Sequence, residues 1–395
     1  MPKTAFIHIG APKTGTTFLQ GIFWANRDAL LEAGLHVVGG KQLDHYRAGN
    51  DLRGLERAED DPRTDWKGEW DTLAAAARTS PAEAVLFTDE HLASLLPEQV
   101  ERAVSTLAPR EVHVIYATRD LVGLMPSEWQ EFVKQRSKLT YEEWATLLFK
   151  STTRRPGRWF NRVHNPPEVI ARWGTAVPPE RFHLITLPPP GAPKDELWRR
   201  FAGVVGIDPA VATDLAAAGN TSLGLPETEL LRRVNIALPE EFRVWDHERL
   251  ARDLLATEIL SPRSKSGRPQ MPESVRPVVT ERADAYIAGI KESGCDVVGD
   301  LEDLRADFGP DAGLAPASDA EVVDAAADAI AGLLVVMSRR RATRRRGAQI
   351  SHGLAQSSRL RRFRLRFMAA ADRHKSVGSV LSGYRRFRHR NDPAG

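Results

Sequence analysis

Residues 10–17 are the first group whose types and spacing can do chemistry. An apolar run, residues 5–9, leads into Gly10-Ala11-Pro12-Lys13-Thr14-Gly15-Thr16-Thr17, and an amphipathic pattern follows over residues 18–24. These patterns predict a strand, a tight loop and a helix. Free N–H groups at the start of a helix, together with the positive end of its dipole, bind phosphate. The glycines let the backbone approach the anion, Lys13 supplies a mobile positive charge, and the hydroxyls of Thr14, Thr16 and Thr17 supply further donors.

The order of residues in this loop differs from that of a Walker A loop, in which the lysine follows the second glycine. Here Lys13 precedes Gly15. The run from Pro12 to Thr17 instead resembles the 5′-phosphosulfate loop of the sulfotransferases that use PAPS (3′-phosphoadenosine 5′-phosphosulfate). The resemblance implies that Lys13 stabilises the leaving phosphate and that the loop holds the 5′-phosphate through Lys13, Thr14, Gly15, Thr16 and Thr17. On this motif alone, a structural turn with a solvated lysine and another kind of nucleotide-binding loop are the alternatives.

A second motif follows a predicted strand over residues 111–117. Arg119 lies just beyond this strand, and Ser127 comes eight positions later, directly after Pro126. Because proline is tolerated in the first turn of a helix, we predict a helix from Ser127 to Arg136. An arginine fork and a serine hydroxyl at such positions converge on one anion. The pair resembles the motif with which sulfotransferases grip the 3′-phosphate of PAPS, although Arg119 followed by Asp120 is also typical of a surface ion pair.

Helical and strand patterns alternate through most of the chain. Further strands are predicted over residues 84–88 and 181–187, with a short edge strand or return loop at 34–40. Such alternation predicts βαβ crossovers and a parallel sheet, so the fold class is α/β. The resemblance covers about residues 1–305 and implies a three-layer sandwich of the P-loop-like sulfotransferase type. We expect a sulfotransferase domain over residues 1–307, a linker over 308–318, and a helical, strongly basic C-terminal extension over 319–395.

Composition excludes several classes of protein. Only one of the 395 residues, Cys295, is a cysteine, which excludes an intramolecular disulfide and a cysteine-based metal cluster. No stretch approaches the roughly 20 apolar residues of a membrane-spanning helix. The chain runs from Met1 almost directly into its first strand, which leaves no room for a signal peptide. We therefore expect a cytoplasmic protein, in keeping with a donor that is made in the cytosol.

The net charge of +3 hides an uneven distribution of charge. Residues 338–395 carry a net charge of +15 and the rest of the chain −12, so the overall balance does not indicate a catalytic domain that binds nucleic acid. Apolar side chains are interleaved with arginines over residues 360–389. This pattern favours an interfacial helix on an acidic membrane surface or an arm on a polyanionic acceptor. A solvated tail, or one folded onto the acidic body, fits equally well.

The general base has three candidates. Glu90 stands at the carboxyl end of the predicted strand 84–88, where open α/β sheets place their sites, and a carboxylate can deprotonate a hydroxyl. His91 is its rival, because the sulfotransferases use either residue type, and His45 is the third candidate. Each has a structural interpretation as well: Glu90 or His91 caps a helix, and His45 is a surface histidine. We rank Glu90 first.

The resemblance implies sulfuryl transfer from PAPS to a hydroxyl of a carbohydrate, a glycolipid or a small molecule, with no metal ion. By analogy with phosphoryl transfer, the protein positions the reactants, neutralises charge and removes a proton. We expect the acceptor pocket to be built from loops such as residues 41–67 and the basic, aromatic run 151–165. Further basic candidates are Lys134, Arg263, Lys265 and Arg268. A nucleotide kinase and a catalytically inactive binding module are the alternative functions.

Overall fold

The computed structural model describes residues 3–55, 66–215, 222–263, 267, 269–309 and 315–339. The chain divides into two compact units, residues 1–327 and 328–395, and the first contains the sheet. Six strands form this sheet in the order β2-β3-β1-β4-β5-β6, and every neighbouring pair is parallel. The strands are β1 (Thr4–Gly10), β2 (Leu35–Val37), β3 (Ala84–Thr88), β4 (Glu111–Thr118), β5 (Phe182–Thr186) and β6 (Asp296–Val298).

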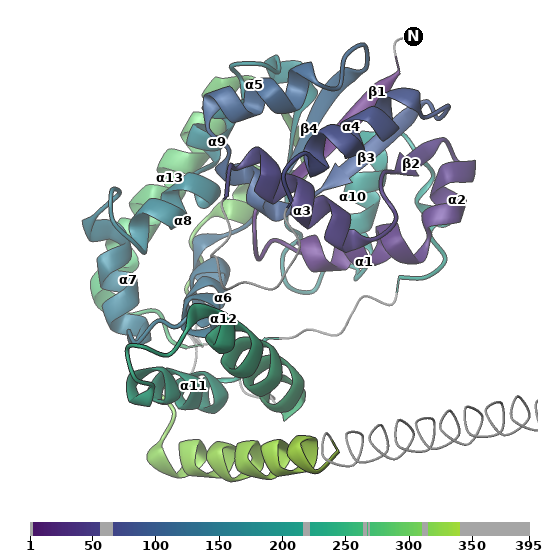
Figure 1. The fold of residues 1–395 in the computed structure, drawn as a ribbon. Coiled ribbons are helices and arrows are strands. Elements are labelled where there is room, and N and C mark those ends of the chain that lie inside the picture. Colours follow the sequence, from purple (N-terminus) through teal and green to yellow (C-terminus); the bar gives the residue numbers. More distant parts are fainter. Residues whose placement is uncertain are drawn as a thin grey trace, which may run out of the picture. The chain divides into compact units, whose positions relative to one another are not determined.

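Side chains of the central strand β1 alternate between two hydrophobic cores, because successive residues of a strand point to opposite faces. Ala5, Ile7 and Ile9 belong to one core, and Phe6 belongs to the other. Helices therefore pack on both faces of the sheet (Figure 1). The first core includes residues of α3 (Gln42–Leu52), α4 (Glu69–Thr79), α5 (Pro97–Ser105), α9 (Pro166–Trp173) and α13 (Arg276–Ser293); the second includes residues of α1 (Thr16–Ala25), α2 (Arg27–Glu32) and α10 (Glu196–Val205).

The remaining helices extend beyond the carboxyl ends of the strands, where α6 is the central element. It spans Leu121–Lys134 and contacts its neighbours α7, α11 and the π-helix η4. These helices are α7 (Tyr141–Lys150), α8 (Gly157–His164), α11 (Leu225–Ala237), α12 (Val244–His247) and η4 (Glu248–Leu260). A further helix covers residues 319–339.

The α/β class and the parallel sheet are confirmed, as are the strands expected over residues 84–88, 111–117 and 181–187. Residues 34–40 were expected to form either an edge strand or a return loop, and Leu35–Val37 is an edge strand. The short strand β6 was not predicted. The predicted helix of the extension is present up to residue 339, whereas the basic run 360–389 lies outside the described residues.

Two predictions about helices are wrong. Helix α6 begins at Leu121 rather than at Ser127, because the Asp120 side chain caps it and accepts a hydrogen bond from the backbone N–H of Gly123 at 2.5 Å. Pro126 consequently lies inside the helix. The two expected acceptor loops are not continuous either, because α3 lies within residues 41–67 and α8 forms the second half of 151–165. No helix within the described ranges is both long and apolar enough to cross a membrane.

Candidate active site

The loop between β1 and α1 is held by close packing on both of its sides. Gly10 has a φ of 99°, and an added Cβ would lie 2.8 Å from Cα of Glu90. Gly15 has a φ of 85°, and an added Cβ would lie 2.4 Å from Cδ2 of Leu197. Only glycine satisfies both the backbone angle and the space at these two positions. The glycines are thus explained by contacts within the protein.

The start of α1 presents backbone donors. Gly15 is the N-cap residue and offers no side-chain oxygen to the first N–H groups of the helix. Thr17 is exposed at this end, and Thr16 is buried. The hydroxyl of Thr14 is already used, because it donates to the carbonyl oxygen of Ala11 at 2.7 Å. An anion at this helix start would therefore meet the N–H groups and Thr17, while Thr14 stabilises the loop.

Lys13 forms an ion pair across the site. Its Nζ lies 2.8 Å from Oε2 of Glu131 on α6, and both side chains are partly exposed. Burial alone would lower the pKa of Lys13, but the carboxylates of Glu131, Glu128 and Glu90 together raise it. Burial would likewise raise the pKa of Glu131, yet Lys13 and Lys134 lower it to about 2. Lys13 is thus protonated, and its charge is balanced by a carboxylate.

The pairing of Lys13 with Glu131 was not predicted. Glu128, Glu131 and Lys134 follow each other at intervals of three along α6 and so lie along one side of the helix. This spacing indicates a charged side of the helix, but nothing in the sequence shows that this side faces the loop after β1. Lys134 is itself buried, and its Nζ lies 4.0 Å from Oε2 of Glu131. Burial and the nearby Lys13 lower the pKa of Lys134, although Glu131 opposes them.

Glu90 follows β3 and opens the short 3₁₀ helix η1 (Glu90–Ser94). Its Oε2 accepts a hydrogen bond of 3.3 Å from Nε2 of Gln20 on α1. Gln20 in turn accepts a hydrogen bond of 2.8 Å from Gln42 on α3 through its Oε1. Two amides thus orient the Glu90 carboxylate, which also contributes to the raised pKa of Lys13. The structure therefore places Glu90 beside the loop that carries Lys13, since an added Cβ at Gly10 would lie 2.8 Å from Cα of Glu90.

His91 is paired with a buried carboxylate. Its Nδ1 lies 2.8 Å from Oδ1 of Asp89, and the same oxygen accepts the backbone N–H of His91 at 3.0 Å. Burial would lower the pKa of His91, but Asp89 outweighs it and raises the pKa above its usual value. Gly49 leaves room for this carboxylate, since an added Cβ would lie 2.0 Å from Oδ2 of Asp89. An Asp–His pair of this kind fixes the ring through Nδ1 and leaves Nε2 for proton transfer.

The geometry of His45 argues against a role as general base. Nδ1 of His45 accepts the backbone N–H of Thr88 at 3.0 Å, and Nε2 donates to the carbonyl oxygen of Val38 at 2.5 Å. Its side chain is buried, and burial lowers its pKa despite these two hydrogen bonds. Both nitrogens of the neutral ring therefore serve to join α3 to β2 and β3. The alternative of a surface histidine is wrong as well.

Arg119 and Ser127 lie on different parts of the β4–α6 unit. Arg119 follows β4, its side chain is 14% exposed, and Nη2 is 3.5 Å from Oδ2 of Asp120. The guanidinium covers the first turn of α6, because an added Cβ at Gly123 would lie 2.2 Å from Nη2. Ser127 is half-buried inside the helix rather than at its start. Arg119 thus remains at the end of a strand, as predicted, while Ser127 offers no helix N-terminus to an anion.

Of the basic candidates at positions 263, 265 and 268, the structure describes only Arg263. Arg263 donates from Nε to Oε1 of Glu227 at 2.9 Å, and this carboxylate is buried. Lys265 and Arg268 lie outside the described residues. Among the residues that the structure does describe, no group of three or more His, Cys, Asp or Glu side chains is arranged to hold a metal ion.

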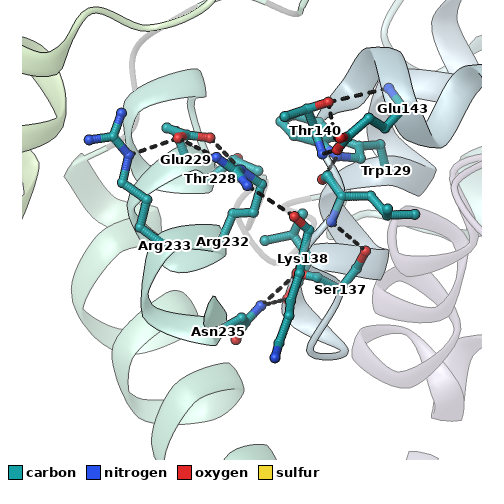
Figure 2. Close-up of polar contacts among 12 residues, drawn as sticks. Trp129, Ser137, Lys138, Thr140, Glu143, Thr228, Glu229, Arg232, Arg233 and Asn235 are labelled. Atoms are coloured by element: carbon teal, nitrogen blue, oxygen red, sulfur yellow. Dashed lines mark hydrogen bonds and ion pairs between the residues drawn. The ribbon is translucent and has the colours of Figure 1, made fainter. Parts of the chain in front are cut away.

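A polar scaffold holds the carboxyl end of α6 against α11 (Figure 2). Nδ2 of Asn235 donates to the carbonyl oxygens of Val133 at 2.8 Å and Ser137 at 3.0 Å. Arg232 donates to the carbonyl oxygen of Lys138 at 2.9 Å. Asn235 also pairs with Nε2 of His247 through its Oδ1 at 2.8 Å. These contacts satisfy carbonyl groups in the last turn of α6 and just after it, and so fix the helix that carries Glu131.

Comparison of the chain with protein-family models, with curated proteins and with solved structures gives no match in any of the three. The family resemblance accordingly depends on the sequence motifs, and the site must be interpreted from its own geometry.

Proposed function

We propose that the chain is a sulfotransferase that uses PAPS as its donor and a hydroxyl as its acceptor. The observation that carries the proposal is that the two predicted motifs and the candidate base Glu90 lie together at the carboxyl end of the sheet. The loop with Lys13 follows β1, Glu90 follows β3, and Arg119 follows β4, and these three strands are neighbours. In open parallel sheets, ligands bind beyond the carboxyl ends of the strands where the strand order reverses, which is beside β1 in this sheet.

The donors at this edge fit a ligand with two phosphate-containing ends. The N–H groups at the start of α1, the hydroxyl of Thr17 and the Lys13 ammonium suit a 5′-phosphosulfate. The Arg119 guanidinium suits a second phosphate, because its planar fork pairs with two oxygens. The proposal assigns no phosphate contact to Ser127, because this residue lies inside α6 rather than at its start.

The chemistry asks little of the protein beyond positioning and charge. PAPS supplies a sulfuryl group joined to a leaving phosphate, so one S–O bond forms to the acceptor while another breaks. Lys13, with its raised pKa, is charged and neutralises the leaving phosphate. Glu90 or the His91 ring, held by Asp89, takes the proton of the acceptor hydroxyl. Glu90 is our first choice, because it packs against Gly10 of the loop that carries Lys13.

Calorimetric titration with PAP, the desulfated product, tests the proposal. We expect PAP to bind more tightly than ATP and the variant Lys13→Ala to lose about tenfold in affinity, as for one charge-assisted hydrogen bond. Lys150→Ala, which removes an exposed lysine of α7, is the matched control and should bind PAP unchanged. Preference for ATP would favour the nucleotide kinase, and absence of any nucleotide binding would overturn the sulfotransferase.

A further inference from the structure

A basic pocket lies beside the candidate active site. It encloses about 410 Å³ and is lined by Arg53, Leu55, Ser94, Leu96, Gln99, Arg155, Arg158, Trp159 and Arg162. Four of these residues are arginines and none is acidic. Its volume falls in the range of small-molecule sites, which is about 300–1,000 Å³.

Helix α8 and the loop before it build one wall of the pocket. Arg158 and Arg162 are four residues apart in α8 and so lie on one side of the helix, and Arg155 lies in the loop just before it. The opposite side carries Phe160 and His164, which are buried. His164 lies 3.3 Å from Glu128 of α6 and so ties α8 to the helix that carries Glu131. The three guanidinium groups are thus presented by an anchored element.

Arg53 contributes the fourth charge from the end of α3. Its Cζ lies 5.9 Å from the centre of the Trp159 ring, and Nη1 donates to Oδ1 of Asn50 at 3.4 Å. Burial lowers the pKa of Arg53, and the nearby Arg162 lowers it further, while Asp89 acts in the opposite sense. Within the described part of the chain, none of the four arginines forms an ion pair with a carboxylate. Like charges held together in this way create a strongly positive potential that attracts an anion.

The pocket shares a wall with the candidate bases. Ser94 lines the pocket and belongs to η1, the short helix that opens with Glu90 and His91. The Ser94 hydroxyl donates to the carbonyl oxygen of His91 at 2.7 Å. The rings of Trp159 and His91 are 6.4 Å apart. A molecule in this pocket therefore lies next to the groups proposed to remove a proton.

We infer that this pocket binds the acceptor through an anionic group, and that the acceptor is an acidic hydroxyl compound bearing a phosphate, sulfate or carboxylate. Binding of an anion in this pocket does not depend on the proposed sulfuryl transfer. Only the statement that the bound anion is the acceptor rests on the proposed function. Guanidinium groups recognise all three anions through paired N–H donors. Neutral hydroxyl compounds would offer no negative charge to these four arginines, so the pocket favours anionic compounds over them.

Titration of the full chain with glucose 6-phosphate, glucuronate and glucose tests this inference. We expect the two anions to bind and glucose to bind at least about tenfold more weakly, since one charged contact corresponds to about that factor. The variants Arg158→Ala and Arg162→Ala should each weaken binding of the anions about tenfold. Arg154→Ala is the matched control, because Arg154 is an exposed neighbour on the same loop that does not line the pocket. Stronger binding of one anion over the other identifies the preferred group.

A second set of titrations, with saturating PAP, separates this inference from the proposed function. Anion binding that depends on Arg158 and Arg162 but not on Arg154, together with PAP binding, supports both. The same arginine dependence without any PAP binding would overturn the sulfotransferase and leave an anion-binding pocket. Equal binding of glucose and the anions, or equal weakening by Arg154→Ala, would overturn the pocket assignment even where PAP binds. Circular dichroism of each variant checks that the fold is intact.

Discussion

Lys13 and Glu131 are 118 residues apart in the sequence, and their side chains meet at 2.8 Å. Lys13 belongs to the loop after β1 and Glu131 to α6. Without a ligand, the Glu131 carboxylate stabilises the charged form of Lys13. It also places a negative charge beside the site proposed for a phosphate. An incoming anion therefore has to share Lys13 with Glu131 or displace it.

The variant Glu131→Gln tests this competition. Removal of the carboxylate should increase the affinity for PAP about tenfold, because a like charge beside the bound phosphate is lost. The pKa of Lys13 should fall at the same time, since Glu131 is one of the carboxylates that raise it. Glu142→Gln, at an exposed position of α7, is the control and should leave PAP binding unchanged. Weaker binding of PAP by Glu131→Gln would show instead that Glu131 positions Lys13.

The variant Gly123→Ala tests the place of Arg119. The added Cβ would lie 2.2 Å from Nη2 of Arg119 and 2.8 Å from Oδ2 of Asp120. Because both atoms end side chains, we expect the helix to persist and the guanidinium to move. Affinity for PAP should fall about tenfold while affinity for 5′-AMP stays the same, as for loss of one charged contact. Gly203→Ala, whose Cβ would meet no atom within 4 Å, should leave both affinities unchanged.

His8 should make the stability of the fold depend on pH. The residue is fully buried on β1, its Nδ1 lies 2.9 Å from Oγ1 of Thr88, and burial lowers its pKa from 6.5 to about 4 against the opposing effect of Asp89. Below pH 6.5 the unfolded chain binds a proton that the folded chain does not. The free energy of unfolding should therefore decrease by up to about 3 kcal/mol between pH 6.5 and 4 on account of this residue.

Urea denaturation of the natural chain and of His8→Phe, at pH 7 and at pH 4.5, measures this contribution. The phenylalanine keeps an aromatic ring between Phe23 and Phe201 but cannot be protonated. The variant should lose less stability than the natural chain on acidification. An equal loss in the two proteins would show that other groups, such as His45 and His113 with their lowered pKa values, dominate the acid response.

Asn235 should contribute to stability through the carbonyl groups that it satisfies at the end of α6 (Figure 2). Its side chain is fully buried, so Asn235→Ala leaves the carbonyl oxygens of Val133 and Ser137 without this donor. The expected loss is about 1–3 kcal/mol in the free energy of unfolding. Ile236→Ala, at a neighbouring exposed position, should change it by less than about 0.5 kcal/mol. Similar small effects of both substitutions would contradict the role of this scaffold.

Much of the sheet could be predicted from the sequence, because its strands are short apolar runs that end at polar or glycine residues. The positions of Lys13, Glu90 and Arg119 followed from these strand ends. The strand β6 was not predicted, because none of its three residues is buried and its apolar pattern is therefore weak. Residues 157–164 were expected to be a loop because proline, glycine and arginines precede and begin them, whereas their apolar side faces α6 and α7.

The polar pairings of the site could not be predicted. With Asp120 as its cap, α6 begins at Leu121, six residues before the expected start, because Pro126 was interpreted as a marker of the first turn. The pairs of Lys13 with Glu131 and of His45 with the backbone of β3 join residues far apart in the sequence. Such contacts depend on how helices pack over the sheet, which no local pattern encodes.

The measurement that tests the central claim most directly is the ratio of the dissociation constants for 5′-AMP and PAP, determined by calorimetry for the natural chain and for Arg119→Ala. These two nucleotides differ by the 3′-phosphate that Arg119 is proposed to bind. We predict that the natural chain binds PAP at least about a hundredfold more tightly than 5′-AMP and that Arg119→Ala reduces this preference about tenfold or more. Equal affinity of the natural chain for the two nucleotides, or a preference that Arg119→Ala leaves unchanged, would contradict the account.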